Sequence, residues 1–261
     1  MSEDVLLLEN LGAVARLTLN RPRAMNSLNL AMVAGLSHHL ADIAADEAVR
    51  VVIITGNGPA FCAGADLKEV LASKALAPGE PDFLDRGDGM FSQLRNFSKP
   101  VIAALNGVTM AGGLELAMCA DIVVAAESAT IADGHANFGV YPGAGGAAVL
   151  PRLIPLNMAM YLLLTGKSLS AVEMKACGLV CEIHPDERLA EAALALATLI
   201  AEKSPTALCR MKAVARASAD KSRDDALRHE QVMMRQHMRS HDFHEGLQAF
   251  AEKRPPRFKG Y

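Results

Sequence analysis

Two glycine-rich turns that follow apolar strands constrain the fold of this 261-residue chain most strongly. The first reads Phe61-Cys62-Ala63-Gly64-Ala65-Asp66 after Val51–Thr55, and the second reads Met110-Ala111-Gly112-Gly113-Leu114-Glu115 after Val101–Leu105. Small residues at the point where a strand gives way to a helix leave backbone N–H groups unpaired and open to close approach. Two such turns from neighbouring strands predict a pair of amide donors aimed at one point. Such a pair forms an oxyanion hole, which stabilises charge developing on a carbonyl oxygen.

Glu115 is the only charged residue between Gly107 and Ala120. A glutamate is almost never fully buried without a partner or a chemical task. An isolated carboxyl group at the start of an apolar helix therefore predicts a residue that transfers a proton. The structural alternative is that the carboxylate caps the N-terminus of its own helix or pairs with an arginine.

Composition and charge narrow the class of protein. With 261 residues, of which 51% are hydrophobic, the chain can bury one large core or a core with a small helical appendage. A net charge of -3 gives no electrostatic reason to expect a nucleic-acid partner. The sequence has no apolar run of roughly 18 residues or more and no signal-peptide pattern. We therefore expect no membrane partner and a cytoplasmic location.

The five cysteines are odd in number and stand among apolar neighbours. Such a set is typical of reduced thiols that fill a core in a reducing compartment. Cys177 and Cys181 are four residues apart, but no second pair and no clustered histidines complete a zinc site. We therefore expect no metal site.

Strand and helix patterns alternate in the N-terminal part of the chain. Val5–Glu9 and Val14–Leu19 are typical of a hairpin, and Asn29 begins a helical pattern that runs to about Ala45. The apolar runs before the two glycine-rich turns are typical of buried strands. Repeated strand–turn–helix units of this kind predict a mixed α/β core.

Later segments favour loops and helices. Ala75–Asp88, centred on Pro78-Gly79-Glu80-Pro81, predicts a loop followed by a helix that ends near Phe97. From Ser170 onward the pattern is mostly helical. Capping residues and apolar spacing predict helices over Asp186–Ala201, Ser204–Ser218, Ser222–Arg239 and within 240–254.

The order of five motifs along the chain resembles that of a known protein family. The motifs are Arg21-Pro22 with Asn26-Ser27-Leu28, Ile54-Thr55-Gly56 with Phe61–Leu67, Lys99–Gly107, Gly112–Ala117 and Tyr141–Gly146. A single glycine cluster is weak evidence, whereas five in this order are strong evidence. On these residues the chain resembles the crotonase superfamily, the enoyl-CoA hydratase/isomerase family, over essentially its whole length.

The resemblance implies an α/β fold in which stacked β-β-α units form the crotonase-like spiral, with a C-terminal helical oligomerisation region. It places the spiral core and its acyl-CoA site in residues 1–200 and the helical trimerisation region in residues 201–261. The implied partners are an acyl-CoA thioester and further copies of the chain, assembled as a trimer or a dimer of trimers. Coenzyme A enters as part of the substrate, and no other cofactor is implied.

Individual binding residues also follow from the resemblance. Carried over by position, the two backbone amides that hold the thioester carbonyl belong to Ala65 and Gly112. The CoA-binding residues carried over in the same way are Arg23, Ala24, Ala63, Asp66 and Leu67. Lys253 is expected to contact a CoA phosphate bound to an adjoining subunit, and a solvated lysine is the alternative.

Position 135 departs from the family pattern. Hydratases of the family usually carry a second glutamate there, and alignment on Gly139 and Pro142–Gly146 places His135 instead. Glu115 and His135 can divide the roles of acid and base, because neutral histidine accepts a proton near physiological pH. Some family hydrolases that cleave cyclic β-diketones resemble this chain in having a histidine here. They pair it with an aspartate nine residues later, where this chain has Ala144.

Three functions are open on the sequence. The first is a lyase of acyl-CoA and fatty acid metabolism that hydrates an α,β-unsaturated acyl-CoA, or catalyses the reverse dehydration, with Glu115 and His135 as acid and base. The second is a hydrolase or carbon–carbon-bond-cleaving enzyme that uses His135 to activate water. The third is a non-catalytic acyl-CoA-binding or assembly protein. The isolated Glu115 argues against the third function, and the missing aspartate argues against the second.

Overall fold

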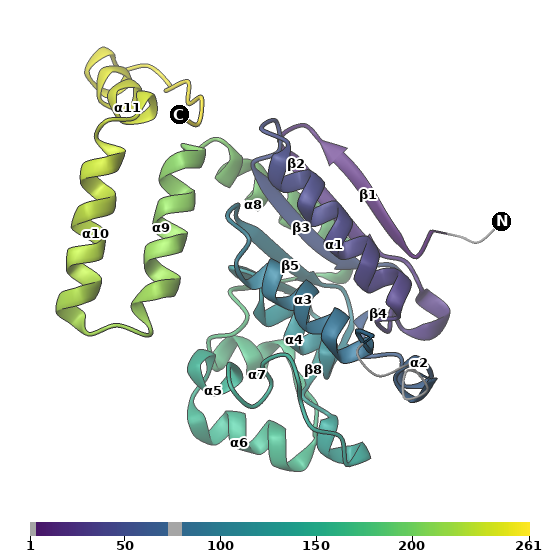
Figure 1. Cartoon of the computed structure of the whole chain (residues 1–261). Helices are drawn as coiled ribbons and strands as arrows, with labels where there is room; N and C mark the ends of the chain where they lie inside the picture. Colours follow the sequence, from purple (N-terminus) through teal and green to yellow (C-terminus); the bar gives the residue numbers. More distant parts are fainter. Residues whose placement is uncertain (1–3, 73–79) are drawn as a thin grey trace.

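Two sheets of mostly parallel strands form the framework of the computed structural model, which describes residues 4–72 and 80–261 (Figure 1). The larger sheet has the order β1 (Leu6–Leu11), β2 (Val14–Leu19), β3 (Val51–Gly56), β5 (Val101–Leu105), β7 (Ile122–Ala126) and β10 (Glu182–His184). The smaller sheet has the order β4 (Ala60–Cys62), β6 (Val108–Met110), β8 (Thr130–Ala132) and β9 (Leu169–Ser170). Antiparallel pairing is confined to β1 with β2 and β8 with β9 among these named strands.

From β3 to β8 the strands alternate between the two sheets, which produces the repeated unit of the fold. β3, β5 and β7 lie side by side in the larger sheet, and β4, β6 and β8, which follow them in the chain, lie side by side in the smaller one. After β6 the chain enters helix α4 (Gly112–Met118). The family fold expected from the sequence, a spiral of stacked β-β-α units, is confirmed.

Helices surround these sheets, and the C-terminal part of the chain is mostly helical. Their bounds are α1 (Leu30–Ala45), α2 (Leu67–Ala72), α3 (Phe83–Arg95), α5 (Leu150–Leu153), α6 (Leu156–Thr165), α7 (Ala171–Ala176), α8 (Leu189–Ala201), α9 (Pro205–Ser218), α10 (Arg223–His237) and α11 (His241–Glu252). Short 3-10 segments are η1 (Pro22–Ala24), η3 (His135–Phe138) and η4 (Asp186–Arg188). Helix α8 packs against β2, β3, β5, β7 and β10, and α1 packs against α3.

Local sequence signals account for most of these bounds. The β1–β2 hairpin forms as predicted, and the side chain of Asn29 caps α1 by accepting a hydrogen bond from Met32 N. Helix α3 ends close to the predicted position, while residues 73–79 of the predicted loop lie outside the described residues. Strand β10 was missed because only three residues, buried partly or not at all, add to the sheet through parallel pairing with β7.

The C-terminal helices differ from the rest of the molecule. Helices α9 and α10 form a hairpin that projects beside the sheets in Figure 1, and neither helix contains a buried residue. The hairpin is anchored to the core because Lys212 and Arg216 of α9 both pair with Asp121, at 2.7 and 2.8 Å. The division at residue 200 into a core and a trimerisation region stays a prediction.

No single helix in residues 4–72 and 80–261 has the length and apolar character needed to cross a membrane. The segments Asp186–Ala201 and Pro205–Ser218 meet those criteria only when they are taken together, across a bend of 103°. The same described residues contain no cluster of three or more His, Cys, Asp or Glu side chains suited to a metal ion. The expectations of a cytoplasmic location, of no metal and of no cofactor apart from CoA stay predictions.

Candidate active site

The two amides predicted to form an oxyanion hole come together. A Cβ atom at Gly112 would lie 3.4 Å from the backbone nitrogen of Ala65, so the two glycine-rich turns meet at this point. Among residues 4–72 and 80–261, neither the Ala65 N–H nor the Gly112 N–H has a hydrogen-bond acceptor. Gly112 is the first residue of α4, where N–H groups have no partner inside the helix. Both donors are therefore available to an external oxygen.

The turn before α4 is closely packed and strained. A Cβ atom at Gly113 would lie 2.0 Å from the carbonyl oxygen of Cys62, which only glycine can avoid. Ala111 has φ 50°, a conformation that is uncommon for a residue with a side chain. Close contact with β4 and this unusual backbone fix the direction of the first N–H of α4.

The segment around Ala65 is held by backbone pairing with Leu28. Leu28 N donates to Gly64 O, and Asp66 N donates to Leu28 O, both at 2.8 Å. Ala63 N donates to Met25 O at 2.9 Å. The structure therefore brings together the two segments that the sequence analysis assigned to CoA.

The predicted CoA residues have different surroundings within these segments. Asp66 pairs with Arg21 at 2.9 Å. Burial acts to raise the pKa of Asp66, but the hydrogen bond and charge of Arg21, together with backbone hydrogen bonds from Lys68 and Glu69, outweigh burial and lower it. Arg23 and Leu67 are exposed, whereas Ala24 and Ala63 are half-buried. The Asp66 side chain thus stabilises the local fold, and the roles of all five residues in binding CoA stay predictions.

Glu115 is buried in α4, and a distant turn holds its carboxylate. Its Oε1 accepts hydrogen bonds from the N–H groups of Ala144, at 2.7 Å, and Gly146, at 3.0 Å. Its described partners are therefore neither an arginine nor the first N–H groups of its own helix. No described residue donates a hydrogen bond to Oε2. One oxygen is fixed by the backbone while the other is open to a ligand or water.

Arg95 connects that turn to α3. Its Nη1 donates to Ala144 O at 3.1 Å, and Ala144 N is one of the two groups that hold Glu115. Arg95 therefore supports the position of Glu115 through the peptide units that flank Ala144. The sequence analysis did not identify Arg95, because its contact spans 49 residues.

His135 begins η3, and its side chain is 11% exposed. Its Nδ1 lies 3.0 Å from Oδ1 of Asp133, while Nε2 has no partner among the described residues. Burial acts to lower the pKa of His135, but the hydrogen bond and charge of Asp133, with the charge of Glu115, outweigh burial and raise it. Gly146 links this pair to Glu115, because its N–H donates to Oε1 of Glu115 and a Cβ atom there would lie 2.5 Å from Oδ2 of Asp133.

Asp133 is the functional candidate that the sequence analysis missed. The hydrolase pattern places the aspartate partner of the histidine nine residues downstream, where this chain has Ala144, whereas the partner in the structure stands two residues upstream. The signal was present as Asp133-Gly134-His135. A turn at Gly134, with φ 70°, brings the two side chains together.

Lys253 lies apart from these residues. It is the C-cap of α11 and is exposed, and Figure 1 shows α11 at the far end of the α9–α10 hairpin, away from α4. A single chain therefore does not bring Lys253 to its own candidate site. The predicted contact with CoA bound to another subunit stays a prediction.

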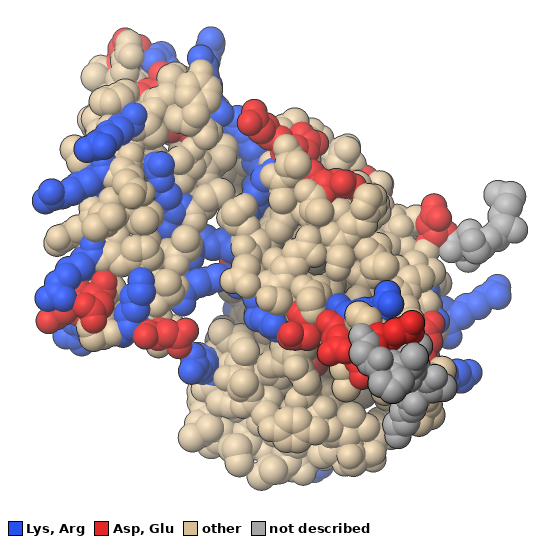
Figure 2. Space-filling model, in the orientation of Figure 1, with Lys and Arg blue, Asp and Glu red and all other residues tan. Residues whose placement is uncertain are grey.

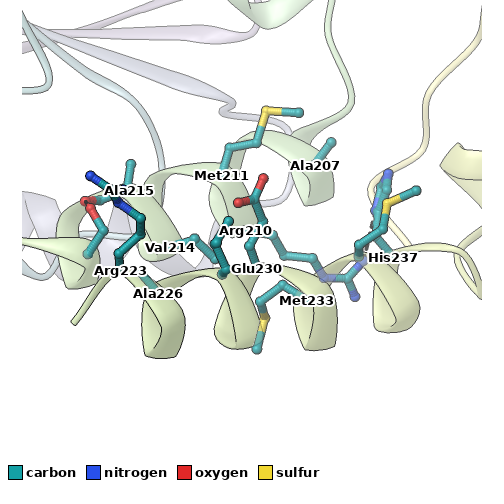
Figure 3. A pocket seen from close by; sticks show the side chains of 13 residues that line it. Ala207, Arg210, Met211, Val214, Ala215, Arg223, Ala226, Glu230, Met233 and His237 are labelled. Atoms are coloured by element: carbon teal, nitrogen blue, oxygen red, sulfur yellow. Dashed lines mark hydrogen bonds between the residues drawn. The ribbon is translucent and has the colours of Figure 1, made fainter. Parts of the chain in front are cut away.

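A separate groove of about 530 Å³ lies between α9 and α10. Its lining is mostly apolar, with Met211, Val214 and Met233 along it, and Arg210 extends toward His237 to form a 2.8 Å hydrogen bond (Figure 3). None of the predicted catalytic residues lines this groove. It belongs to the hairpin and not to the site around Glu115.

Comparisons with known proteins agree with the fold and identify the family. The profile of the family described as enoyl-CoA hydratase/isomerase matches residues 9–261. The chain is 38% identical to a 2,3-dehydroadipyl-CoA hydratase from Escherichia coli, with 100% of both chains covered. It is also 38% identical to a probable enoyl-CoA hydratase from Rhizobium meliloti, with 99% of each chain covered.

The solved structures include close matches in fold. A crystal structure of an enoyl-CoA hydratase from Bacillus anthracis superposes with a TM-score of 0.92 at 36% sequence identity. The match covers 98% of this chain and 100% of that chain. The similarity thus extends over the C-terminal helices as well as the sheets.

Proposed function

Because the chain belongs to the enoyl-CoA hydratase/isomerase family, we propose that it adds water to the double bond of an α,β-unsaturated acyl-CoA, or catalyses the reverse dehydration. One observation carries the proposal. The buried carboxyl group of Glu115 lies on helix α4. The first N–H of this helix, that of Gly112, lies close to the N–H of Ala65. Proton transfer and stabilisation of an oxyanion are thereby combined on one short helix.

The proposed reaction has two parts, the addition of water at C3 and the protonation of C2. Neutral His135 accepts a proton from water at Nε2, and the hydroxyl oxygen forms a bond to C3 of the enoyl group. The π electrons then move through C2 to the thioester oxygen, where the N–H groups of Ala65 and Gly112 stabilise the enolate. Glu115, which begins the cycle protonated, delivers its proton to C2, and the proton on His135 then restores the acid form of Glu115. The balance is one water added across C2 and C3.

Product analysis tests the proposal. The protein is incubated with a panel of enoyl-, 3-hydroxyacyl- and β-ketoacyl-CoA thioesters, and the products are identified by mass spectrometry. We expect interconversion of an enoyl-CoA and its 3-hydroxyacyl-CoA, which differ by one water. Conversion of no member, with thioester binding retained, would contradict the proposal and favour the non-catalytic binding function.

Thioester hydrolysis is a second candidate because of one observation. The Asp133–His135 contact supplies a carboxylate–imidazole pair in place of the aspartate missing at position 144, and such a pair activates water. Attack of that water on the thioester carbonyl, with the oxyanion at the same two amides, would release a carboxylic acid and free CoA. The product panel separates the two reactions, because only hydrolysis releases a free thiol.

We also propose that the chain assembles as a trimer or a dimer of trimers through its C-terminal helices. Helices α9 to α11 expose large apolar side chains, among them Met211 at 64%, Val232 at 51% and Phe250 at 85%. Lys and Arg side chains gather over the same hairpin (Figure 2). Burial of such apolar surfaces is the driving force for association. In this assembly Lys253 binds a phosphate of CoA held by the adjoining subunit.

Light scattering and kinetics test the assembly. Phe250→Glu is expected to lower the mass from that of a trimer or hexamer toward that of one chain. Lys253→Gln is expected to raise KM for the acyl-CoA while the mass stays unchanged. A wild-type mass of one chain, or a KM that does not respond to Lys253→Gln, would contradict the corresponding part of the proposal.

A further inference from the structure

Asp133 is a buried carboxylate that the proposed reaction does not use. It lies between β8 and η3 and is 1% exposed, so it cannot contact a substrate directly. Oδ1 lies 3.0 Å from Nδ1 of His135, and no described residue provides a hydrogen-bond partner for Oδ2. Burial of a carboxylate without full pairing is unfavourable. A compensating role is therefore expected for this side chain.

We propose that Asp133 is a positioning residue that holds His135 with its proton on Nδ1, so that Nε2 is the atom that exchanges a proton with water. This inference rests on the proposed function, because it assigns the task of His135 within that reaction. An acceptor at Nδ1 selects the tautomer in which Nδ1 carries the hydrogen, and the lone pair is then on Nε2. The same arrangement orients the histidine in the triads of serine hydrolases.

The packing around Gly146 supports a role for Asp133 in the site as a whole. A Cβ atom at Gly146 would lie 2.5 Å from Oδ2 of Asp133, so glycine is needed there to make room for the carboxylate. The N–H of Gly146 donates to Oε1 of Glu115. Gly146 therefore packs against the carboxylate of Asp133, which orients His135, and its N–H also holds Glu115. The two proton-transfer groups share a structural support.

A simpler role for Asp133 is to form the turn before η3. Its Oδ1 also lies 3.4 Å from the backbone nitrogen of His135, which is the contact of an Asx turn. The ring contact is 0.4 Å shorter, as the two distances of 3.0 and 3.4 Å show. Asparagine forms an Asx turn as well as aspartate does, but it carries no charge. Replacement by asparagine therefore separates the two roles.

The charged groups that act on His135 are few. Asp133 comes from the segment after β8, and Glu115 comes from α4. Helix α6, which packs against η3, has no Asp, Glu, Lys, Arg or His, and Tyr161 is its one titratable side chain. A change in the titration of His135 on replacement of Asp133 is thus assigned to the lost carboxylate.

The test compares Asp133→Asn with the wild type in two measurements. Nitrogen-15 NMR titration reports the pKa and the tautomer of the His135 ring, and kinetics with an enoyl-CoA report kcat, KM and the pH profile. We expect Asp133→Asn to lower the pKa of His135, to shift the ring away from the Nδ1–H tautomer and to move the acidic limb of kcat/KM to lower pH. We also expect kcat to fall by on the order of a hundredfold with a small change in KM.

Two further variants complete the experiment. Asp186→Asn is the matched control, because Asp186 is a carboxylate that accepts hydrogen bonds from Ser128 on another part of the molecule, and it is expected to leave the titration and kcat unchanged. Asp133→Ser supplies a hydroxyl group that can accept the hydrogen bond of the turn, and it replaces Asp133→Asn in both measurements if the asparagine variant does not fold.

The outcomes distinguish this inference from the proposed function. An unchanged His135 titration and an unchanged kcat in a folded Asp133 variant would overturn the positioning role and leave Asp133 as a turn residue. If the wild type has no hydration activity, the proposed reaction is contradicted. If the His135 titration nevertheless responds to Asp133→Asn, the contact that orients the ring is still supported.

Discussion

Helix α4 and the segment around η3 hold their proton-transfer groups in different ways. Every residue of α4 is buried, and Glu115 is held by two backbone N–H groups. His135 is held by the side chain of Asp133, on a segment that also exposes Phe138 at 68% and Tyr141 at 80%. Backbone donors do not titrate, whereas both partners of the second contact do. A change of pH can therefore alter the contact that holds His135, whereas the N–H donors that hold Glu115 keep their charge state.

The largest effect is expected for Glu115→Gln. The side-chain oxygen of glutamine still accepts from Ala144 N and Gly146 N, but the group no longer transfers a proton. We expect kcat to fall by roughly a hundred- to ten-thousandfold, with binding of a saturated acyl-CoA retained. Stopped assays with an enoyl-CoA and thermal melting measure the two properties. Retained activity with a lowered Tm would show that Glu115 is only a structural carboxylate.

Gly112→Val tests the second proposed role of α4, which is to supply a backbone N–H to the oxyanion hole. The added methyl groups would occupy the point where the N–H groups of Gly112 and Ala65 converge, since a Cβ there lies 3.4 Å from Ala65 N. We expect turnover to fall by on the order of a hundred- to a thousandfold, the scale expected when one oxyanion-hole donor is lost. Gly89→Val on α3 is the matched control, because a Cβ at Gly89 meets no atom within 4 Å. Equal turnover for both folded variants would exclude Gly112 from the site.

The pH profile sharpens the contrast between the two regions. Because Asp133 and Glu115 raise the pKa of His135 above the ordinary imidazole value of about 6.5, the ring becomes protonated already at a higher pH. If neutral His135 is the base, kcat/KM falls as pH decreases through that raised pKa, by about tenfold per pH unit. His135→Ala is expected to remove this limb together with most of the activity. A profile and rate that His135→Ala does not alter would leave Glu115 as the sole acid–base group.

The smallest effect on kcat is expected for loss of Arg95, the residue of α3 that supports the turn holding Glu115. Arg95→Met removes the hydrogen bond to Ala144 O, and a hydrogen bond of this kind contributes about 1 kcal/mol. Since Ala144 N and Gly146 N still hold Glu115, we expect a loss in kcat of less than about tenfold. Arg152→Met removes an exposed pair with Asp220 and is the control. A loss as large as that of Glu115→Gln would mean that the turn collapses without Arg95.

The elements that the sequence predicted well depend on residues close together in the chain. The β1–β2 hairpin and the start of α1 at Asn29 follow from local spacing and a local cap. The two glycine-rich turns are far apart in the chain, and they predicted that two amide donors from neighbouring strands would meet; the family resemblance assigned these donors to Ala65 and Gly112. The structure brings the two turns together, because parallel strands that lie side by side bring their ends to one edge. Motif order was sufficient to identify the family.

The tertiary structure alone decided how the acid–base groups are held. Residues 29 and 31 positions away provide the N–H groups that contact Glu115, and no local pattern indicates which distant turn will supply them. Asp133 is close to His135 in sequence, but its contact depends on the left-handed turn at Gly134 and on the space that Gly146 leaves. The sequence by itself determined which chemical groups are present and the family fold that carries them. Their partners were decided by long-range packing, because a buried polar group is paired with whichever donor or acceptor the folded chain brings within hydrogen-bond distance.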